Sequence, residues 1–201
     1  MTLATQPAKQ VLAQPDLPAT PVLKTARLIL RAPRRGDSKA IVRLVNDRRV
    51  AENTARIPHP YFLDDAETFV AAANRQVGEA IFAIIRDDEL IGMCGVEPRQ
   101  DGPEIGYWLG TPFWGRGYAT EAIRAAIDHA FGVLGHDMLQ AAARVSNPSS
   151  RRVLEKCGFQ WSSVGLYRIR AINSSAPLDR FRLDRGLWAS LKAWGDAREV
   201  A

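Results

Sequence analysis

The stretch from Gly110 to Gly117 constrains the fold of this chain more than any other segment. Before it, residues 104–109 (Glu-Ile-Gly-Tyr-Trp-Leu) form a short run typical of a strand. After it, apolar residues recur at spacings of three and four through residues 123–134, the pattern of an amphipathic helix. Glycines between a strand and a helix let the backbone turn sharply and approach a ligand closely. We therefore expect an α/β structure built around this junction.

Further strands and helices are expected on both sides of the junction. The predicted strands are residues 27–31, 80–86, 89–96, 104–109, 138–145, a run starting at Phe159, and 178–183. The predicted helices are 38–48 after a capping Asp37, 65–76 after Asp64, the helix after Gly117, and 147–158 with Asn147 as its cap. Residues 187–198 are expected to form a short C-terminal helix or a tail. Strands before a helix, followed by strand–helix–strand, predict a mixed sheet flanked by helices in one α/β domain.

The domain is expected to span residues 23–201. Residues 1–22 contain four prolines and no periodic apolar pattern, so they are predicted to form a flexible N-terminal arm. No apolar run is long enough for a membrane span, and the first residues lack the pattern of a secretory signal. The sequence therefore predicts a cytoplasmic protein without membrane association.

Charge and cysteine content argue against two other classes. The formal net charge is +5, but the basic residues are scattered in short pairs such as Arg34-Arg35, so nucleic-acid binding is a minor alternative. Cys94 and Cys157 lie in apolar surroundings and form no CxxC pair. Buried reduced thiols and no metal site are expected.

The start of the helix after Gly117 predicts an anion site. The first N–H groups of a helix have no internal partner and lie at the positive end of its dipole, which suits a phosphate. Arg116 can add a charge-assisted hydrogen bond. A P-loop would need Lys-Ser/Thr where Tyr118-Ala119 stand, and a dinucleotide fingerprint would need three spaced glycines after the first strand. A simple turn remains the alternative to a phosphate compound bound in another way.

Several segments resemble GNAT acetyltransferases. Residues 114–119 (Trp-Gly-Arg-Gly-Tyr-Ala) resemble the family's Q/R-x-x-G-x-G/A pyrophosphate loop, with Trp114 in place of Gln or Arg. Residues 147–159 resemble its N-x-x-S/A…E-K-x-G-F helix. Residues 104–109 and 57–61 are similar to the ribosomal-protein N-acetyltransferase branch, the RimJ/RimL type. The resemblance implies the GNAT fold, whose mixed sheet is splayed between the fourth and fifth strands and binds acetyl-CoA in the splay.

The resemblance also implies which residues bind acetyl-CoA. The pyrophosphate is expected on the loop and helix start, formed by Trp114, Gly115, Arg116, Gly117, Tyr118, Ala119 and Thr120. Backbone N–H groups near Trp108 and Leu109 are expected to hold the pantetheine arm and polarise the thioester carbonyl. Asn147 and Ser150 are expected to contact the same arm, and Asn147 also suits a helix cap.

Two residues are candidates for proton transfer. Attack of an amine on a thioester requires a neutral amine, a stabilised oxyanion and a proton for the thiolate. Glu104 is the candidate base through a water molecule, or a carboxylate that only shapes the site. Most GNAT enzymes have a Tyr as the general acid where this chain has Leu154. Ser150 resembles the hydroxyl of the RimJ/RimL branch and is the candidate acid; the alternatives are a water molecule as the acid and Ser150 as a cofactor contact only. His59, in the loop 53–63, is a possible substrate contact, whereas His129 is expected at a helix surface and His136 at a helix end.

Three functions remain open from the sequence. The favoured one is transfer of an acetyl group from acetyl-CoA to a primary amine, preferably a protein N-terminal α-amine, by a monomer or homodimer. The second is acetylation of a small amine, such as a polyamine or an antibiotic. The third is a CoA-binding module without catalysis. Acceptor specificity is expected to lie in the loops 53–63 and 166–178.

Overall fold

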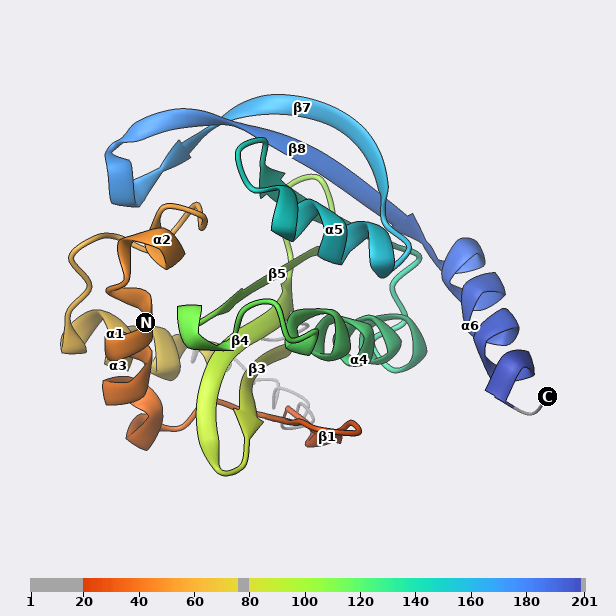
Figure 1. Cartoon of the computed structure of the whole chain (residues 1–201), viewed down its shortest axis with the longest axis horizontal. Helices are drawn as coiled ribbons and strands as arrows, with labels where there is room; N and C mark the ends of the chain where they lie inside the picture. The colour runs from red at the N-terminus through yellow and green to blue at the C-terminus, as the bar shows by residue number, and fades with distance from the viewer. Residues whose placement is uncertain (1–19, 76–79, 200–201) are drawn as a thin grey trace, which may run out of the picture.

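The computed structural model describes residues 20–75 and 80–199 (Figure 1). In this part of the chain one eight-stranded sheet runs in the order β1-β2-β3-β4-β5-β6-β8-β7. The strands are β1 Leu23–Lys24, β2 Ile29–Arg31, β3 Ala80–Arg86, β4 Glu89–Glu97, β5 Glu104–Leu109, β6 Met138–Arg144, β7 Gln160–Ile169 and β8 Ser174–Asp184. The helices are α1 Ser38–Val45, α2 Arg48–Ala51, α3 Leu63–Ala73, α4 Tyr118–Gly132, α5 Pro148–Lys156 and α6 Arg185–Glu199, with short 3-10 turns at Arg35–Asp37, Thr111–Phe113 and Arg170–Ile172. The predicted mixed α/β sheet flanked by helices is confirmed.

The sheet opens between β5 and β6. These two strands are parallel, and only Glu104 and Gln140 are in register, whereas β4 and β5 pair along their whole shared length. Strands that share one pair diverge beyond it, so the sheet splays after Glu104. This is the splay expected between residues 104–109 and 138–145, the fourth and fifth predicted strands.

Helices cover both faces of the sheet. Successive residues of a strand point to opposite faces, and β3 feeds two cores in this way: Phe82 packs with one cluster, and Ile81 and Ala83 pack with the other. The first core is completed by α4, whose predicted apolar stripe is buried, and the second by α1 and α3. These layers hold the start of α4 beside the end of β5.

The C-terminal part of the sheet differs from expectation. The loop expected at residues 166–178 is instead the tip of a long hairpin of β7 and β8, which curves over one end of the sheet (Figure 1). Ile169, Ala176 and Leu178 are buried in a small core of their own. This third core explains why both strands extend well past the predicted ones. The expected specificity loop is thus a β-hairpin.

Three local predictions were wrong in detail. Asp37 does not cap α1, because its carboxylate accepts hydrogen bonds from the Arg31 guanidinium and the Arg34 backbone. The second predicted helix begins at Leu63 rather than after Asp64. His129, expected at the surface, is buried with its ring edge-on to Phe82.

The N-terminal region is described only from residue 20 onward. The predicted flexible arm falls largely on residues 1–19, outside the described residues, so the boundary at residue 23 stays a prediction. The strand β1 was not predicted and pairs with β2 from Leu23. No helix within residues 20–75 and 80–199 is long and apolar enough to cross a membrane.

Candidate functional site

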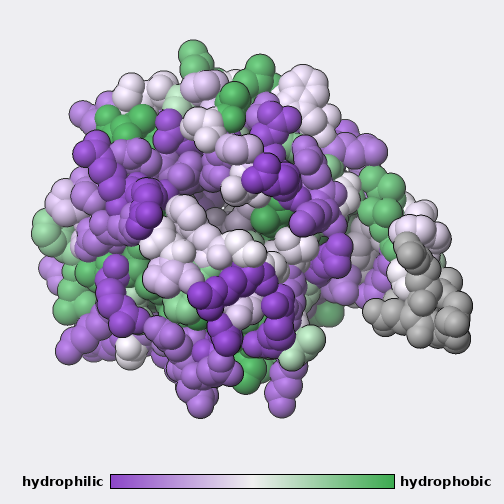
Figure 2. Space-filling view, in the orientation of Figure 1, coloured by the Kyte–Doolittle hydropathy of each residue, from purple (hydrophilic) through white to green (hydrophobic). Residues whose placement is uncertain are grey.

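Two cavities meet where β5 and β6 diverge. The first, of about 310 Å³, lies among the end of β5, the start of α4 and α5. The second, of about 610 Å³, lies among β4, β5, β6 and the β7–β8 hairpin. The residues that line both are Asn53, Thr54, Tyr107, Trp108 and Ser150. The face that carries α4 and α5 is otherwise largely hydrophilic, with apolar residues scattered over it (Figure 2). The cavities are therefore the features of this face that suit a ligand.

Most of the predicted cofactor-binding residues line the first cavity. These are Trp108, Leu109, Trp114, Gly115, Gly117, Tyr118, Ala119, Thr120, Asn147 and Ser150. Arg116 is the exception. Its side chain is exposed, and its carbonyl accepts a hydrogen bond from Arg27 Nη1 at 3.1 Å. The structure therefore brings together all the predicted residues except the Arg116 side chain.

The glycine-rich loop has a left-handed backbone at two positions. Gly115 has a φ of 74° and Gly117 a φ of 80°, values that residues with a side chain rarely adopt. Gly117 is the N-cap of α4, so the N–H groups of the first helical turn have no partner within the helix. The Trp114 indole donates to Leu109 O at 2.8 Å, which ties the loop to the end of β5. The loop thus presents free backbone donors at a fixed place.

The start of α5 forms the opposite wall of the first cavity. Asn147 Oδ1 accepts a hydrogen bond from the Ser150 backbone N–H at 3.1 Å, so the predicted helix cap is confirmed. Arg152 and Lys156, which were not selected from the sequence, also line this cavity. Their spacing of four places them on one side of the helix, a signal the sequence contained. They add positive charge where an anionic ligand would lie.

Tyr107 joins the two cavities and was also missed. Its hydroxyl lies 2.9 Å from Ser150 Oγ. Burial raises the pKa of Tyr107 to about 12, so its phenol stays protonated near neutral pH. Leu154, at the position where most GNAT enzymes place a Tyr, is buried in the first core. The residues at the junction that carry hydroxyl groups are Thr54, Tyr107 and Ser150, and the Thr54 hydroxyl donates to Ala51 O at 2.9 Å.

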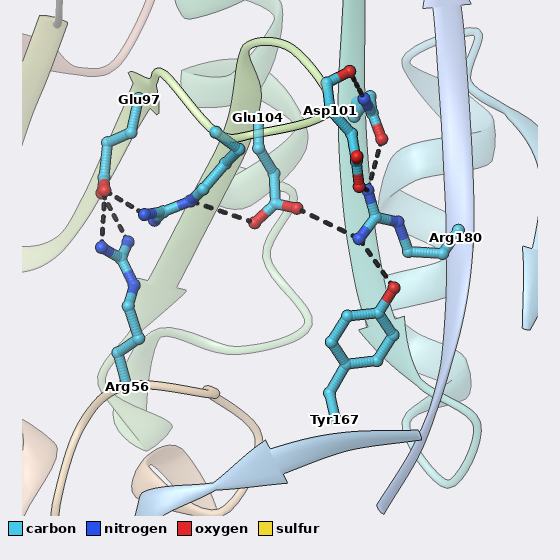
Figure 3. Close-up of polar contacts among 8 residues, drawn as sticks. Arg56, Glu97, Asp101, Glu104, Tyr167 and Arg180 are labelled. Atoms are coloured by element: carbon cyan, nitrogen blue, oxygen red, sulfur yellow. Dashed lines mark hydrogen bonds and ion pairs between the residues drawn. The ribbon is translucent and has the colours of Figure 1, made fainter. Parts of the chain in front are cut away.

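A chain of alternating charges crosses the second cavity (Figure 3). Glu97 accepts two hydrogen bonds of 2.6 Å from Arg56 and one of 2.7 Å from Arg99. Burial opposes ionisation of Glu97, but the hydrogen bonds and charges of these two arginines lower its pKa. Glu97 is therefore a fixed carboxylate with its lone pairs already engaged.

Glu104 is held more loosely in the same chain. Its oxygens lie 3.9 Å from Arg99 Nε and 3.9 Å from Arg180 Nη1, both too far for hydrogen bonds. Arg180 itself donates to the Tyr167 hydroxyl at 2.9 Å and to Gln140 Oε1. The Glu104 carboxylate therefore keeps lone pairs that a water molecule or a ligand N–H can use.

Opposite charges are balanced in the second cavity. The acidic lining residues are Asp64, Asp65, Glu97 and Glu104, and the basic ones are Arg56, Arg144, Arg170 and Arg180. Such a lining offers both hydrogen-bond acceptors for a cation and donors for carbonyl or carboxylate oxygens. It does not have the acidic excess that would favour a polycation.

The remaining reactive side chains contribute little to this site. Cys94 and Cys157 are buried free thiols, as predicted, and burial raises the pKa of Cys94 to about 12 and that of Cys157 to about 11. Neither thiol forms a nucleophilic thiolate near neutral pH. His59 lines neither cavity and lies 3.2 Å from Asn46 O through Nε2. Among the described residues no group of three or more His, Cys, Asp or Glu side chains is placed to hold a metal ion.

The sequence of this chain is similar to those of known acetyltransferases. Residues 27–160 match the Acetyltransferase (GNAT) domain. An uncharacterized N-acetyltransferase of Bacillus subtilis, YoaA, is 31% identical over 79% of this chain and 93% of its own. The ribosomal-protein-serine acetyltransferase of Escherichia coli is 37% identical over 39% of this chain and 46% of its own. This chain spans about half the length of that enzyme and of other curated relatives that it matches.

Solved structures share the fold. The spermidine N-acetyltransferase of Vibrio cholerae, solved in complex with CoA and spermine, superimposes with a TM-score of 0.69. The match covers 82% of this chain and 99% of that chain at 22% identity. At this identity the similarity concerns the architecture alone.

Proposed function

Because the chain belongs to the GNAT acetyltransferase family, we propose that it transfers an acetyl group from acetyl-CoA to the α-amine of a protein N-terminus. The observation that carries the proposal is the meeting of two cavities at Tyr107 and Ser150. The first cavity has the lining that a CoA ester requires, and the second has room for an amine. A ligand in each would bring the two reacting groups together at the junction.

The residues of the first cavity fit acetyl-CoA. Backbone N–H groups at Gly117 and the first turn of α4 suit the pyrophosphate. Arg152 and Lys156 line the same cavity and would add charge for the phosphates, and the opening between β5 and β6 would leave a slot for the extended arm. Acetyl-CoA would supply the activated thioester, and the protein groups would hold it in place.

Two residues are proposed to move protons. Glu104, across the second cavity, would accept a proton from the acceptor ammonium through a water molecule, because its lone pairs are not taken by hydrogen bonds to Arg99 or Arg180. Ser150 would deliver a proton to the departing thiolate. The Tyr107 hydroxyl, 2.9 Å behind it, can replace that proton. This assignment is supported by the positions of the side chains, since Glu104 lines the second cavity and Ser150 and Tyr107 line both.

The charge balance of the second cavity supports a peptide as the acceptor. A peptide N-terminus carries one ammonium group followed by carbonyls that accept hydrogen bonds from arginine side chains. A polyamine carries several positive charges and gains no net attraction here, because the four carboxylates of this lining are balanced by four arginines. The Escherichia coli relative, a ribosomal-protein-serine acetyltransferase, supports the same acceptor class.

An acceptor panel tests the proposal. Thiol release from acetyl-CoA is measured with short peptides bearing free N-termini, with spermidine and with an aminoglycoside. We expect kcat/KM at least about 10-fold higher for the free peptides, equivalent to about 1.4 kcal/mol of transition-state discrimination. Peptides with a blocked N-terminus and an internal lysine are the matched control. A preference for spermidine or for blocked peptides would contradict the acceptor assignment, and CoA binding without thiol release would indicate a binding module.

Replacing Ser150 with alanine tests the proposed acid. The variant should lower kcat by about 100-fold, the lower end of the range for a positioned acid, because a thiolate leaves more readily than most groups. The affinity for acetyl-CoA should change little. Ser190→Ala, on the exposed helix α6, is the matched control. An unchanged kcat with a raised KM for acetyl-CoA would reassign Ser150 to cofactor binding.

A further inference from the structure

Hydrogen bonds join the glycine-rich loop and the start of α4 to residues near the N-terminus. The bonded cluster comprises Thr25, Arg27 and Glu121. Glu121, in the first turn of α4, accepts hydrogen bonds from Thr25 Oγ1 at 2.6 Å, from the Arg27 backbone N–H at 2.8 Å and from Arg27 Nε at 2.7 Å. The turn before β2 is thereby joined to the start of α4.

Arg27 also holds the loop backbone directly. Its Nη1 donates to the carbonyl of Arg116 at 3.1 Å. The carbonyl of Arg116 and the N–H of Gly117 belong to one peptide unit, and in a trans peptide these two groups point in opposite directions. Because the carbonyl is drawn outward toward Arg27, the Gly117 N–H is turned to the opposite side. Gly115 and Gly117 line the first cavity and Arg116 does not, which agrees with this orientation.

Several contacts keep Arg27 in one place. Its guanidinium lies over the Tyr118 ring at 4.7 Å, and Arg86 lies over the same ring at 5.1 Å. A methyl group added at Gly117 would stand 3.3 Å from Arg27 Nη2, so the arginine packs closely against the loop. Burial opposes ionisation of Glu121, but the hydrogen bonds from Thr25 and Arg27 lower its pKa and keep it a carboxylate.

The cluster contributes little to the free energy of unfolding of the domain. The Arg27 side chain is 48% exposed, and ion pairs at such positions typically contribute less than about 1 kcal/mol. Its other effect is geometric, because it fixes one peptide unit beside the first cavity. Preorganised backbone donors bind an anion more tightly than donors that must first be ordered.

We propose that Arg27 and Glu121 are positioning residues that hold the Gly117 N–H toward the first cavity and thereby set the affinity for the pyrophosphate of acetyl-CoA. The proposal rests on the proposed function in one respect, namely that the ligand of the first cavity is a CoA ester. Neither residue touches the reacting atoms. The effect of the pair should therefore appear in cofactor affinity and not in kcat at saturating cofactor.

Titration calorimetry with CoA provides the first measurement. Arg27→Met keeps most of the apolar stem but loses the side-chain hydrogen bonds to Glu121 and Arg116, and Glu121→Gln removes the charge on the other side. We expect the Kd for CoA to rise about 10-fold or more in each variant, which corresponds to about 1.4 kcal/mol. Arg43→Met, which removes an exposed ion pair with Glu89 on another face of the domain, should bind CoA like the wild type.

A truncated donor separates loop positioning from general damage. S-acetylpantetheine lacks the pyrophosphate, so its kcat/KM should be the same in the wild type, in Arg27→Met and in Glu121→Gln. Equal losses with S-acetylpantetheine and acetyl-CoA would overturn the proposal in favour of a merely structural role. CoA affinity within twofold of wild type in both variants would overturn it as well. If the wild-type chain fails to bind CoA, the proposed function itself is wrong, an outcome distinct from the other two.

Discussion

Replacing Gly117 with valine should weaken CoA binding by at least about 100-fold while the domain remains folded. Gly117 has a φ of 80°, and a β-branched residue in this region is strained by about 1–3 kcal/mol. Its first added carbon would also stand 3.3 Å from Arg27 Nη2. The Arg27 side chain can shift to relieve the close contact, but the backbone strain is relieved by rotating the peptide that Arg27 holds, and that rotation takes the Gly117 N–H out of the cavity. Titration calorimetry with CoA measures the loss.

A glycine at the other end of the same helix serves as the control. Gly132 ends α4, has no atom within 4 Å of an added methyl group and is exposed. Gly132→Val should therefore keep the affinity of the wild type. Circular dichroism and thermal melting show whether both variants are folded. A folded Gly117→Val protein with unchanged CoA affinity would remove the glycine-rich loop from the binding site.

The parts of this site that the sequence could predict depend on short-range patterns. The buried stripe of α4 and the cap at Asn147 each follow from residues a few positions apart. The conformational freedom of glycine and the periodicity of a helix also depend on residues that are close in sequence. A glycine-rich loop before an amphipathic helix can therefore be recognised from the order of its residues. Most of the residues that these patterns selected line the first cavity, and their role in binding acetyl-CoA stays a prediction.

The parts that the sequence could not predict depend on residues far apart in the chain. Tyr107 and Ser150 meet across 43 positions, and Arg27 and Glu121 across 94. In the sequence, Tyr107 stands in a largely apolar strand and looks like a core residue. Its hydroxyl lies at the junction of the cavities only because β5 diverges from β6. The length of the β7–β8 hairpin was underestimated for a related reason, because the small core at its tip combines residues from both strands.

Glu104→Gln should lower kcat about 10²- to 10³-fold with a free N-terminal peptide as the acceptor. Glutamine has nearly the same shape but cannot take up a proton, and the usual contribution of a positioned base is about 10²- to 10⁴-fold. The neighbouring arginines should stay in place, because Arg99 remains bonded to Glu97 and Arg180 to Tyr167. The KM for acetyl-CoA should be unchanged, since Glu104 lines the second cavity and not the first. Glu89→Gln, at the exposed hairpin between β3 and β4, is the matched control.

The pH dependence of this deficit distinguishes a base from a residue that only shapes the cavity. A peptide α-amine has a pKa of about 7.7–8.0, so solvent deprotonates it increasingly above pH 8. The contribution of a catalytic base therefore falls as the pH rises, because the solvent already deprotonates the acceptor amine. The ratio of wild-type to Glu104→Gln rates should therefore be largest near pH 6.5 and shrink toward pH 9. If Glu104 only shapes the cavity through its contacts with Arg99 and Arg180, the ratio stays constant across this range, because the lost contact is the same whether or not the acceptor is already neutral.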